Sequence, residues 1–363
     1  MHIISFIPRK LTGQITLWAC SLVSYAWYSA SNRYLYESPI LIGANFDQFV
    51  RTICPSKNVH IRASPLAALV RRLDMGDLVH DASRSLTARL LGRLKCSLEV
   101  FVAPQVSFAV NSLAALSKCT KLRYLDLSLI SSSISHKALF QAIRSLTQLE
   151  TILLPRSSIN NQHVISEPYN WPSCLNTLHV SGGVDDQFFI FQLTNAPKTL
   201  SNLGIQHCPQ VHASAIIHSL CGLGSNIAYL SIIHPMPRLY LGELDGILRL
   251  CPALLSLRIS VDFISENFFK MIPVNHALQA LELECSHSAE TDITPNTIFD
   301  AIDRSLFPDL RRLKISPRLA WDSTSQMRSD IQDLSDILEA MEIEKPLHIP
   351  CGVWITDLAS VNF

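Results

Sequence analysis

The feature that most constrains this fold is an apolar motif that recurs at a nearly constant interval. The first, fourth and sixth positions of the motif are apolar, and it occurs ten times between residues 70 and 315. The ten motifs begin at Val70, Leu98, Leu122, Leu149, Leu175, Leu200, Ile227, Leu254, Leu278 and Leu310. Eight of the nine intervals lie between 24 and 28 residues, and the ninth is 32. A regular interval of this length indicates a tandem array of one structural unit.

Each motif predicts a short strand, and segments of helical period separate several of the strands. Alternate strand residues point to opposite faces, so the fourth and sixth positions enter one core. Helical period is found in residues 106–116, 138–146, 213–223, 241–250 and 297–306. One strand–helix unit cannot cover its own apolar face, whereas stacked units bury a continuous core. The sequence therefore predicts an α/β fold, a leucine-rich-repeat horseshoe solenoid of about ten repeats with a parallel sheet on its concave face. A doubly wound α/β domain is the alternative, but that fold does not require a fixed interval.

The array divides the chain into four expected parts. A short all-helical segment covers residues 1–40, and a linker with an N-terminal cap covers 41–69. The repeats cover 70–317, and a C-terminal cap and tail cover 318–363. Residues 46–54 and 323–343 are the expected capping helices, since the ends of a solenoid must be covered.

The first forty residues carry two expected helices. Residues 3–8 read Ile-Ile-Ser-Phe-Ile-Pro, typical of a short apolar helix that ends in a turn, and residues 17–28 indicate a second helix with a broad apolar face. The "I-x-x-F-I-P" helix end, the "C-S-L-V-S-x-x-W" helix from Cys20 to Trp27, and the Tyr-Leu-Tyr-Glu-Ser-Pro stretch at 34–39 resemble fungal F-box proteins with leucine-rich repeats. The F-box is a helical motif that docks on the Skp adaptor of cullin-type ubiquitin ligases. The resemblance implies that adaptor-facing or box-core positions are Ile4, Phe6, Leu22, Val23 and Trp27.

This segment departs from the family pattern in one respect. An F-box normally opens with a Leu-Pro pair and an acidic, leucine-rich first turn, and this sequence begins after them. Met1 falls inside the expected first helix. Either the box is degenerate or the true start of the chain lies upstream.

The sequence carries no signature of catalysis or of metal binding. His207, Cys208 and His212, and Cys285 with His287, lack the four-ligand spacing of zinc sites. Neither a Gly-x-Ser-x-Gly elbow nor an HExxH motif is present. Asp185 precedes an apolar run, so N-capping is its expected role. We therefore expect no enzyme, no cofactor and no metal. The formal net charge of zero predicts no nucleic-acid partner.

The third and fifth positions of each motif are expected on the concave face, where a target protein would bind. Tyrosine and arginine are enriched at binding hot spots, and an acidic patch followed by a basic patch (Arg311, Arg312 and Lys314) could fix the register of a ligand. The expected target-binding residues are Tyr124, Asp126, His179, Tyr229, Arg258, Glu282, Glu284 and Arg312.

The resemblance implies a substrate-recognition subunit of a cullin-type (SCF) E3 ubiquitin ligase. Its partners would be a Skp-type adaptor, a cullin and an unidentified target. The alternative is a stand-alone leucine-rich-repeat scaffold with a degenerate F-box. A secreted protein with residues 15–30 as signal is a third hypothesis, opposed by the polar residues of that segment and by the lack of an Asn-x-Ser/Thr acceptor. We expect no membrane association and a cytoplasmic or nuclear location.

Overall fold

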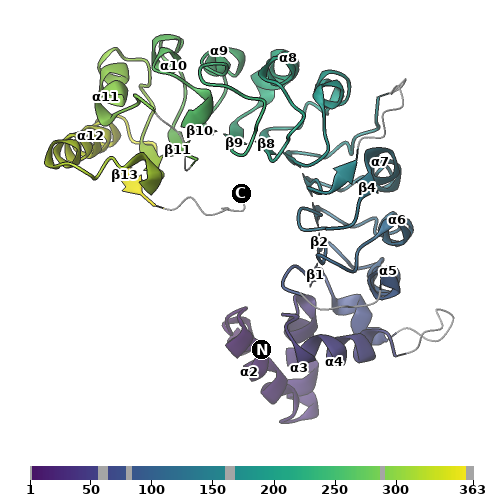
Figure 1. Ribbon diagram of the computed structural model, residues 1–363. Helices are drawn as coiled ribbons and strands as arrows, with labels where there is room; N and C mark the ends of the chain where they lie inside the picture. The colour runs from purple at the N-terminus through teal and green to yellow at the C-terminus, as the bar shows by residue number, and fades with distance from the viewer. Residues whose placement is uncertain (1, 56–63, 79–83, 160–167, 287–290, 357–363) are drawn as a thin grey trace. The chain divides into compact units, whose positions relative to one another are not determined.

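A computed structural model describes residues 2–55, 64–78, 84–159, 168–286 and 291–356. The chain forms two compact units, unit 1 (Met1–Asn176) and unit 2 (Thr177–Phe363). Both units are built from the same strand–helix repeat, with strands along the inner side of each unit and helices along its outer side (Figure 1).

Unit 1 begins with four helices, α1 (His2–Ser5), α2 (Leu11–Ser21), α3 (Tyr25–Glu37) and α4 (Ala44–Ile53). The expectation of a single helix over residues 17–28 is wrong, because the chain breaks between α2 and α3. Ser24 has extended backbone angles, and its hydroxyl accepts a hydrogen bond from the Trp27 amide at 3.3 Å. This N-cap starts α3 in a new direction. The expected capping helix at 46–54 corresponds to α4.

The described residues of the unit 1 repeats form four parallel strands and the helices that cover them. The strands are β1 (Arg72–Asp74), β2 (Val100–Val102), β3 (Tyr124–Asp126) and β5 (Thr151–Leu153), paired in that order. The helices are η1 (Pro65–Leu69), α5 (Arg84–Leu94), α6 (Val110–Leu116) and α7 (His136–Ile143). A separate two-residue pairing joins β4 (Ile134–Ser135) to β6 (Ser158–Ile159).

Unit 2 continues the pattern with seven parallel strands in chain order among its described residues. They are β7 (Thr177–Val180), β8 (Asn202–Gln206), β9 (Tyr229–Ile233), β10 (Ser256–Ser260), β11 (Ala280–Glu284), β12 (Arg312–Ile315) and β13 (Gly352–Ile355). The α-helices are α8 (Ala213–Leu223), α9 (Ile247–Leu250), α10 (Asn267–Lys270), α11 (Pro295–Asp303) and α12 (Ser325–Glu344). Short turns of other helix types are η2 (Phe188–Gln192), η3 (Leu193–Asn195), η4 (Gly224–Asn226), η5 (Val261–Phe263) and η6 (Pro317–Leu319).

The ten motifs predicted from the sequence are confirmed as the core of the two units. Each motif contains a strand that begins at its third position. The thirty side chains at the first, fourth and sixth positions are at most 2% exposed. Burying a Leu, Ile or Val side chain contributes about 1.5–3 kcal/mol, so this repeated apolar set is the main source of stability.

The expected helix over residues 241–250 is wrong over most of its length. Gly242 has φ +80°, which interrupts a right-handed helix, and only α9 remains helical. The Asp245 carboxylate instead accepts hydrogen bonds from the Ser265 amide at 2.7 Å and the Ser265 hydroxyl at 2.6 Å. The turn is therefore tied to the following repeat. By contrast, the helix expected at 213–223 matches α8.

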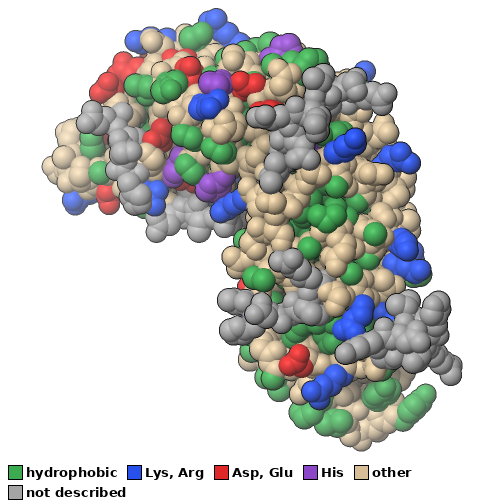
Figure 2. All heavy atoms as spheres, turned by 45° about the vertical axis from the view of Figure 1, so that its right-hand side comes forward, with side chains coloured by type: hydrophobic (Ala, Val, Ile, Leu, Met, Phe, Trp, Pro, Cys, Tyr) green, Lys and Arg blue, Asp and Glu red, His purple; other side chains and the backbone are tan. Residues whose placement is uncertain are grey.

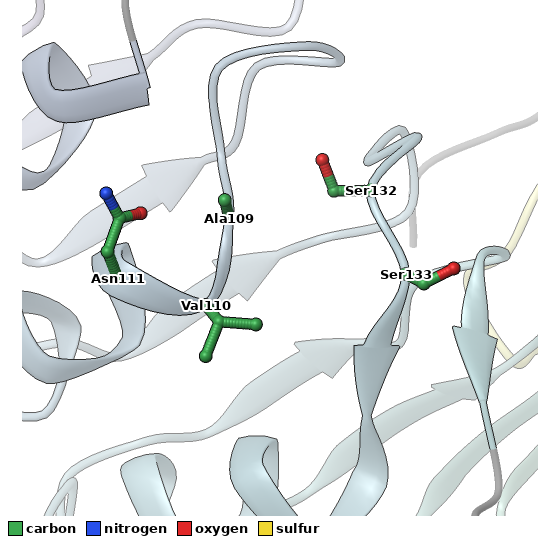
Figure 3. A pocket seen from close by; sticks show the side chains of 5 residues that line it. All are labelled: Ala109, Val110, Asn111, Ser132 and Ser133. Atoms are coloured by element: carbon green, nitrogen blue, oxygen red, sulfur yellow. The ribbon is translucent and has the colours of Figure 1, made fainter.

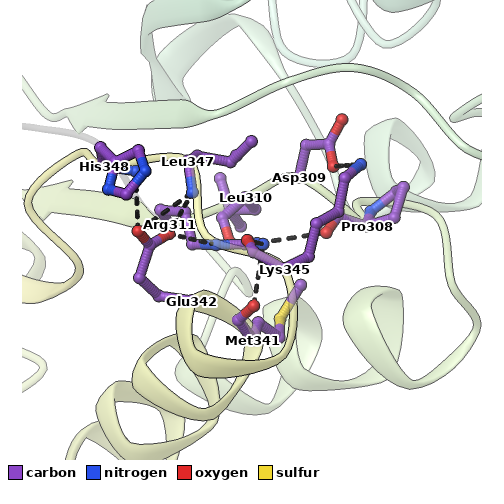
Figure 4. Close-up of polar contacts among 9 residues, drawn as sticks. All are labelled: Pro308, Asp309, Leu310, Arg311, Met341, Glu342, Lys345, Leu347 and His348. Carbon is purple, nitrogen blue, oxygen red and sulfur yellow. Dashed lines mark hydrogen bonds and ion pairs between the residues drawn. The ribbon is translucent and has the colours of Figure 1, made fainter.

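The C-terminal end of unit 2 is held by a buried arginine. The Arg311 guanidinium is fully buried, pairs with Glu342 at 3.0 Å and donates to the carbonyls of Met341 at 3.0 Å and Lys345 at 2.9 Å (Figure 4). The expectation that Arg311 belongs to an exposed basic patch is wrong, because this side chain points to α12 rather than to the inner face. The expected capping helix at 323–343 corresponds to α12.

Candidate functional site

An exposed apolar stripe runs along α2. Three apolar side chains of the helix and the one at its C-cap are spaced three or four residues apart. Each is about half exposed or more, and they are Leu11, Ile15, Trp18 and Leu22. This spacing places them on one face of the helix. The opposite face carries Gly13 and Leu17, which are buried.

The turn around α2 brings further exposed apolar side chains to the same end of unit 1. Ile3 and Phe6 lie in and just after α1, Val23 lies in the α2–α3 turn, and Tyr25 begins α3. Figure 2 shows hydrophobic side chains at this end of the unit. We call the set of Ile3, Phe6, Leu11, Ile15, Trp18, Leu22, Val23 and Tyr25 the N-terminal apolar surface. Exposed apolar groups in this number are typical of a surface that binds another protein.

The five predicted adaptor-binding residues separate into two groups. Phe6 is 80% exposed, Leu22 67% and Val23 68%, so these three belong to the N-terminal apolar surface. Ile4 is 4% exposed and lies in the core of the helical segment, and Trp27 is 39% exposed at the start of α3. The resemblance predicted that these positions face the adaptor or form the box core, and their contact with an adaptor stays a prediction.

Close backbone contacts hold this surface in place. A Cβ atom on Gly13 would lie 1.8 Å from the Pro8 carbonyl oxygen, so only glycine allows α2 to pack on the α1–α2 turn. The Gln14 side chain accepts from the Ile40 amide at 2.6 Å and donates to the Ile40 carbonyl at 3.4 Å. Arg9 pairs with Glu37 at 3.1 Å across the same segment. The apolar side chains are therefore displayed by an ordered scaffold.

The inner face of unit 1 places Tyr124 and Asp126 on β3 with part of each side chain exposed. Burial, followed by the nearby Asp126 carboxylate, raises the pKa of Tyr124, so its phenol stays protonated at neutral pH and can donate a hydrogen bond. Asp126 Oδ1 accepts from the Ser128 amide at 2.9 Å and the Ser128 hydroxyl at 2.7 Å. Asp126 thus also shapes the turn that follows its strand.

The inner face of unit 2 places His179 and Tyr229 toward solvent. A Cβ atom on Gly204 would lie 2.3 Å from His179 Nδ1, so the imidazole lies directly over the backbone of the next strand. Tyr229 is 39% exposed at the start of β9. Along the register, His179 is followed by the small residues Gly204 and Ser231, and Tyr229 lies between Asn202 and Ser256. The inner face of unit 2 therefore presents an aromatic ring and an imidazole to solvent.

Three predicted target-binding residues are buried, contrary to the expectation that they are exposed. Arg258, Glu282 and Glu284 are 5%, 8% and 7% exposed. Arg258 pairs with Glu284, and Glu282 forms ion pairs with Lys314 at 3.2 Å and Arg312 at 3.5 Å. Neighbouring strands bring these charges together because β10, β11 and β12 pair in register. The ion pairs neutralise the carboxylates, and only Arg312 and Lys314 remain partly exposed.

Two features of these surfaces were not predicted. The stripe on α2 has a readable helical spacing, but the predicted helix started at residue 17 and so omitted Leu11 and Ile15. Trp354 lies on β13 opposite Lys314 and extends the inner face of unit 2. No regular interval marks β13, because it follows the last motif by about forty residues, well beyond one repeat.

The groups considered for metal binding are engaged in other contacts. Asp186 pairs with His212 at 2.7 Å, and burial raises the pKa of the Cys208 thiol to about 12. His287 lies outside the described residues. No group of three or more His, Cys, Asp or Glu side chains in the described part of the chain could hold a metal ion. Asp185 does cap the following turn, since its carboxylate accepts from the Phe188 amide at 2.9 Å.

A hollow of about 450 Å³ in unit 1 is lined by neutral side chains. Ala109, Val110 and Asn111 line one side of it, and Ser132 and Ser133 line the other (Figure 3). None of these five residues has an ionisable side chain, so they offer no acid, base or charged ligand. Within the described residues, no helix is long and apolar enough to cross a membrane.

Comparison with known proteins identifies fungal relatives. The chain is 33% identical over 329 residues to the F-box protein YDR306C of Saccharomyces cerevisiae, a match that covers 88% of this chain and 66% of the relative. The chain thus spans slightly less than two thirds of that protein's length. It is 32% identical over 314 residues to protein pof5 of Schizosaccharomyces pombe, covering 85% of this chain and 86% of pof5.

Family profiles and solved structures provide a second comparison. No protein-family profile matches the chain. Among solved structures, the leucine-rich-repeat protein LegL7 of Legionella pneumophila aligns at 12% identity with a TM-score of 0.43, covering 74% of this chain and 91% of that one.

Proposed function

This chain belongs to the family of fungal F-box proteins with leucine-rich repeats, and on that premise we propose that it is a substrate-recognition subunit of a cullin-type (SCF) ubiquitin ligase. The N-terminal apolar surface would dock on a Skp-type adaptor, which would in turn connect the chain to a cullin. The inner faces of the repeats would hold a target protein. The chain would supply proximity rather than chemistry, because tethering raises the effective concentration of the target near the ubiquitin-carrying enzyme.

The observation that carries the proposal is the exposed apolar stripe on α2. Leaving Leu11, Ile15, Trp18 and Leu22 in water has a free-energy cost that burial against a partner would recover, at roughly 25 cal/mol per Å² of apolar area. The stripe lies within the segment that resembles an F-box. Its side chains are apolar rather than charged, which fits an adaptor interface that excludes water at its centre.

On the inner faces, we propose that target contact is made by the exposed predicted residues. These are Tyr124 and Asp126 in unit 1, and His179, Tyr229 and Arg312 in unit 2. Arg258, Glu282 and Glu284 would act indirectly, because their buried ion pairs fix where Arg312 and Lys314 lie. Tyrosine and arginine offer large contact areas together with hydrogen-bond donors, as hot-spot residues do.

A direct binding measurement tests the adaptor contact. Purified chain and a purified Skp-type adaptor are mixed, and their affinity is measured by calorimetry for the wild type and for Leu22→Asp/Val23→Asp. Both substituted side chains are about two-thirds exposed, so the variant should fold normally, while each carboxylate would be desolvated at the interface. We expect the affinity to fall at least a hundredfold, which equals about 2.7 kcal/mol.

The matched control is Leu241→Asp/Val274→Asp in unit 2, where the two side chains are 59% and 71% exposed. This variant has the same change in charge and apolarity and should bind the adaptor as the wild type does. If neither the wild type nor the control binds the adaptor, the chain is instead a stand-alone repeat scaffold. Equal loss in both variants would contradict the assignment of α2.

A further inference from the structure

The formal net charge of zero conceals an uneven distribution of charge along the chain. Unit 1 contains 18 Lys and Arg against 9 Asp and Glu, whereas unit 2 contains 12 against 21. The net charges of the two units are therefore equal and opposite. Charge asymmetry of this kind points to a binding role for the basic half.

Five of the 18 Lys and Arg residues of unit 1 lie on the turns that lead from α5, α6 and α7 to the next strand. The sequence has no acidic residue in 82–98, 100–125 or 127–149. Lys95 follows α5, Lys118 and Lys121 follow α6, and Arg144 is the C-cap of α7. All four side chains are exposed. We call Lys95, Lys118, Lys121 and Arg144 the basic edge, and Figure 2 shows Lys and Arg side chains along the helical side of unit 1.

Contacts between successive turns place these cations next to one another. The Ser145 hydroxyl donates to the Ser117 carbonyl at 2.7 Å, so Arg144 and Lys118 lie on adjoining turns. The Cys119 thiol approaches the Leu91 carbonyl at 3.9 Å and is close enough to Lys95 for that charge to lower its pKa against the larger effect of burial. The basic edge thus crosses three consecutive repeats.

A structural explanation accounts for the position of these cations but not for their lack of partners. Cations near helix C-termini are stabilised by the helix dipole, at about 0.3–1 kcal/mol each. Unit 2 also places cations at such positions, and three of these have an acceptor within their unit. Lys270 pairs with Glu266 at 3.8 Å, Lys345 pairs with Asp309, and Arg304 donates to the Asp300 carbonyl at 3.0 Å. Among the described residues, no side chain of the basic edge has such an acceptor.

We propose that the basic edge binds an acidic polypeptide segment of a partner protein. Four cations on three repeats match a segment with several carboxylates. The carboxylates of Glu99 and Glu150, which lie on the same turns, are paired with Arg71 and Arg123. A nucleic-acid strand is the less suitable ligand, because single strands bind by stacking bases on aromatic side chains. The exposed large apolar side chains described between residues 84 and 159 are Val106, Val110 and Leu129, none of which is aromatic. This surface is separate from the N-terminal apolar surface.

The test uses the full chain and two labelled probes of similar charge, a peptide of about twenty glutamates and a single-stranded DNA of about twenty nucleotides. Fluorescence anisotropy measures the affinity of each probe at low and physiological ionic strength. The test variant is Lys95→Glu/Lys118→Glu/Arg144→Glu. The control is Lys198→Glu/Lys270→Glu/Arg304→Glu, which changes three exposed cations of unit 2 by the same charge. Thermal unfolding verifies that both variants are folded.

We expect the peptide to bind the wild type and the control with similar affinity, and to bind the test variant at least tenfold more weakly. The affinity should fall as salt rises, because solvent-exposed charges are screened. Three results would overturn the proposal: no peptide binding to the wild type, equal binding by both variants, or tighter binding of the DNA than of the peptide. The last would identify a nucleic-acid surface instead. Adaptor affinity should be unchanged in the test variant, so this outcome is distinguishable from failure of the adaptor contact.

Discussion

At the scale of single residues, Gly13 is the position on which the N-terminal apolar surface depends most. A Cβ atom there would meet the backbone of Pro8 at 1.8 Å, and backbone cannot rotate away as a side chain can. We predict that Gly13→Ala lowers the free energy of unfolding by about 1–3 kcal/mol, as overpacking does, and increases hydrogen exchange in α2. Gly92 lies in α5 with no atom within 4 Å of an added Cβ, so Gly92→Ala should instead raise stability by about 0.5–1 kcal/mol. Urea denaturation of both variants checks the opposite signs, and a shift of the same sign in both would refute the packing argument.

Residue types alone could not have predicted which charged side chains of the inner face are accessible to solvent. Arg258, Glu282 and Glu284 occupy positions that the repeat assigns correctly to the inner face. Their burial arises from pairing between strands that are 24 to 32 residues apart in sequence, which a motif read one repeat at a time does not reveal. Gly204 beneath His179 is a similar case, since the ring of one repeat covers the backbone of the next.

At the scale of elements, the helix α12 is attached to the sheet by a contact that depends on pH. Hydrogen bonds from the Leu347 and His348 amides, together with the charge of Arg311, hold the pKa of Glu342 below its usual value of 4.5 despite desolvation (Figure 4). A carboxyl whose pKa is lower in the folded state stabilises that state above pH 4.5, and the contribution is lost as pH falls through the folded value. We predict that Glu342→Gln unfolds at a lower temperature than the wild type at pH 7, and that the difference shrinks toward pH 3. Thermal unfolding across this range measures it, and a difference independent of pH would contradict the role of the carboxylate.

The elements differ in how far the sequence predicted them. The ten repeat strands follow from spacing alone, because each must bury three apolar side chains at fixed positions. The helices between them were less predictable, as the interruption at Gly242 and the break at Ser24 show. A single polar side chain or a glycine decides where such a helix begins or ends, whereas the apolar period runs past these points. The strand β13 lies too far beyond the last repeat for the interval to predict it.

At the scale of the whole molecule, the net charge averaged over the chain conceals how the charge is distributed. A net charge of zero predicted no nucleic-acid partner, and the two units carry opposite net charges. On these proposals, separate regions have separate tasks. The N-terminal apolar surface would bind by burial of apolar groups, the inner faces by aromatic and polar side chains, and the basic edge by charge. Each region should therefore respond to a different variant and to a different change in solvent.

The measurement that tests the central proposal most directly is affinity purification of the tagged chain from a fungal cell, with the Skp-type adaptor and the cullin quantified in each preparation. The wild type and an inner-face variant, Tyr229→Ala/Arg312→Ala, should retain adaptor and cullin equally. Leu22→Asp/Val23→Asp should lose both, while Leu241→Asp/Val274→Asp should retain both. Retention of adaptor and cullin by the Leu22→Asp/Val23→Asp chain, or their absence from the wild type, would contradict the proposal that this protein is a ligase subunit joined through α2.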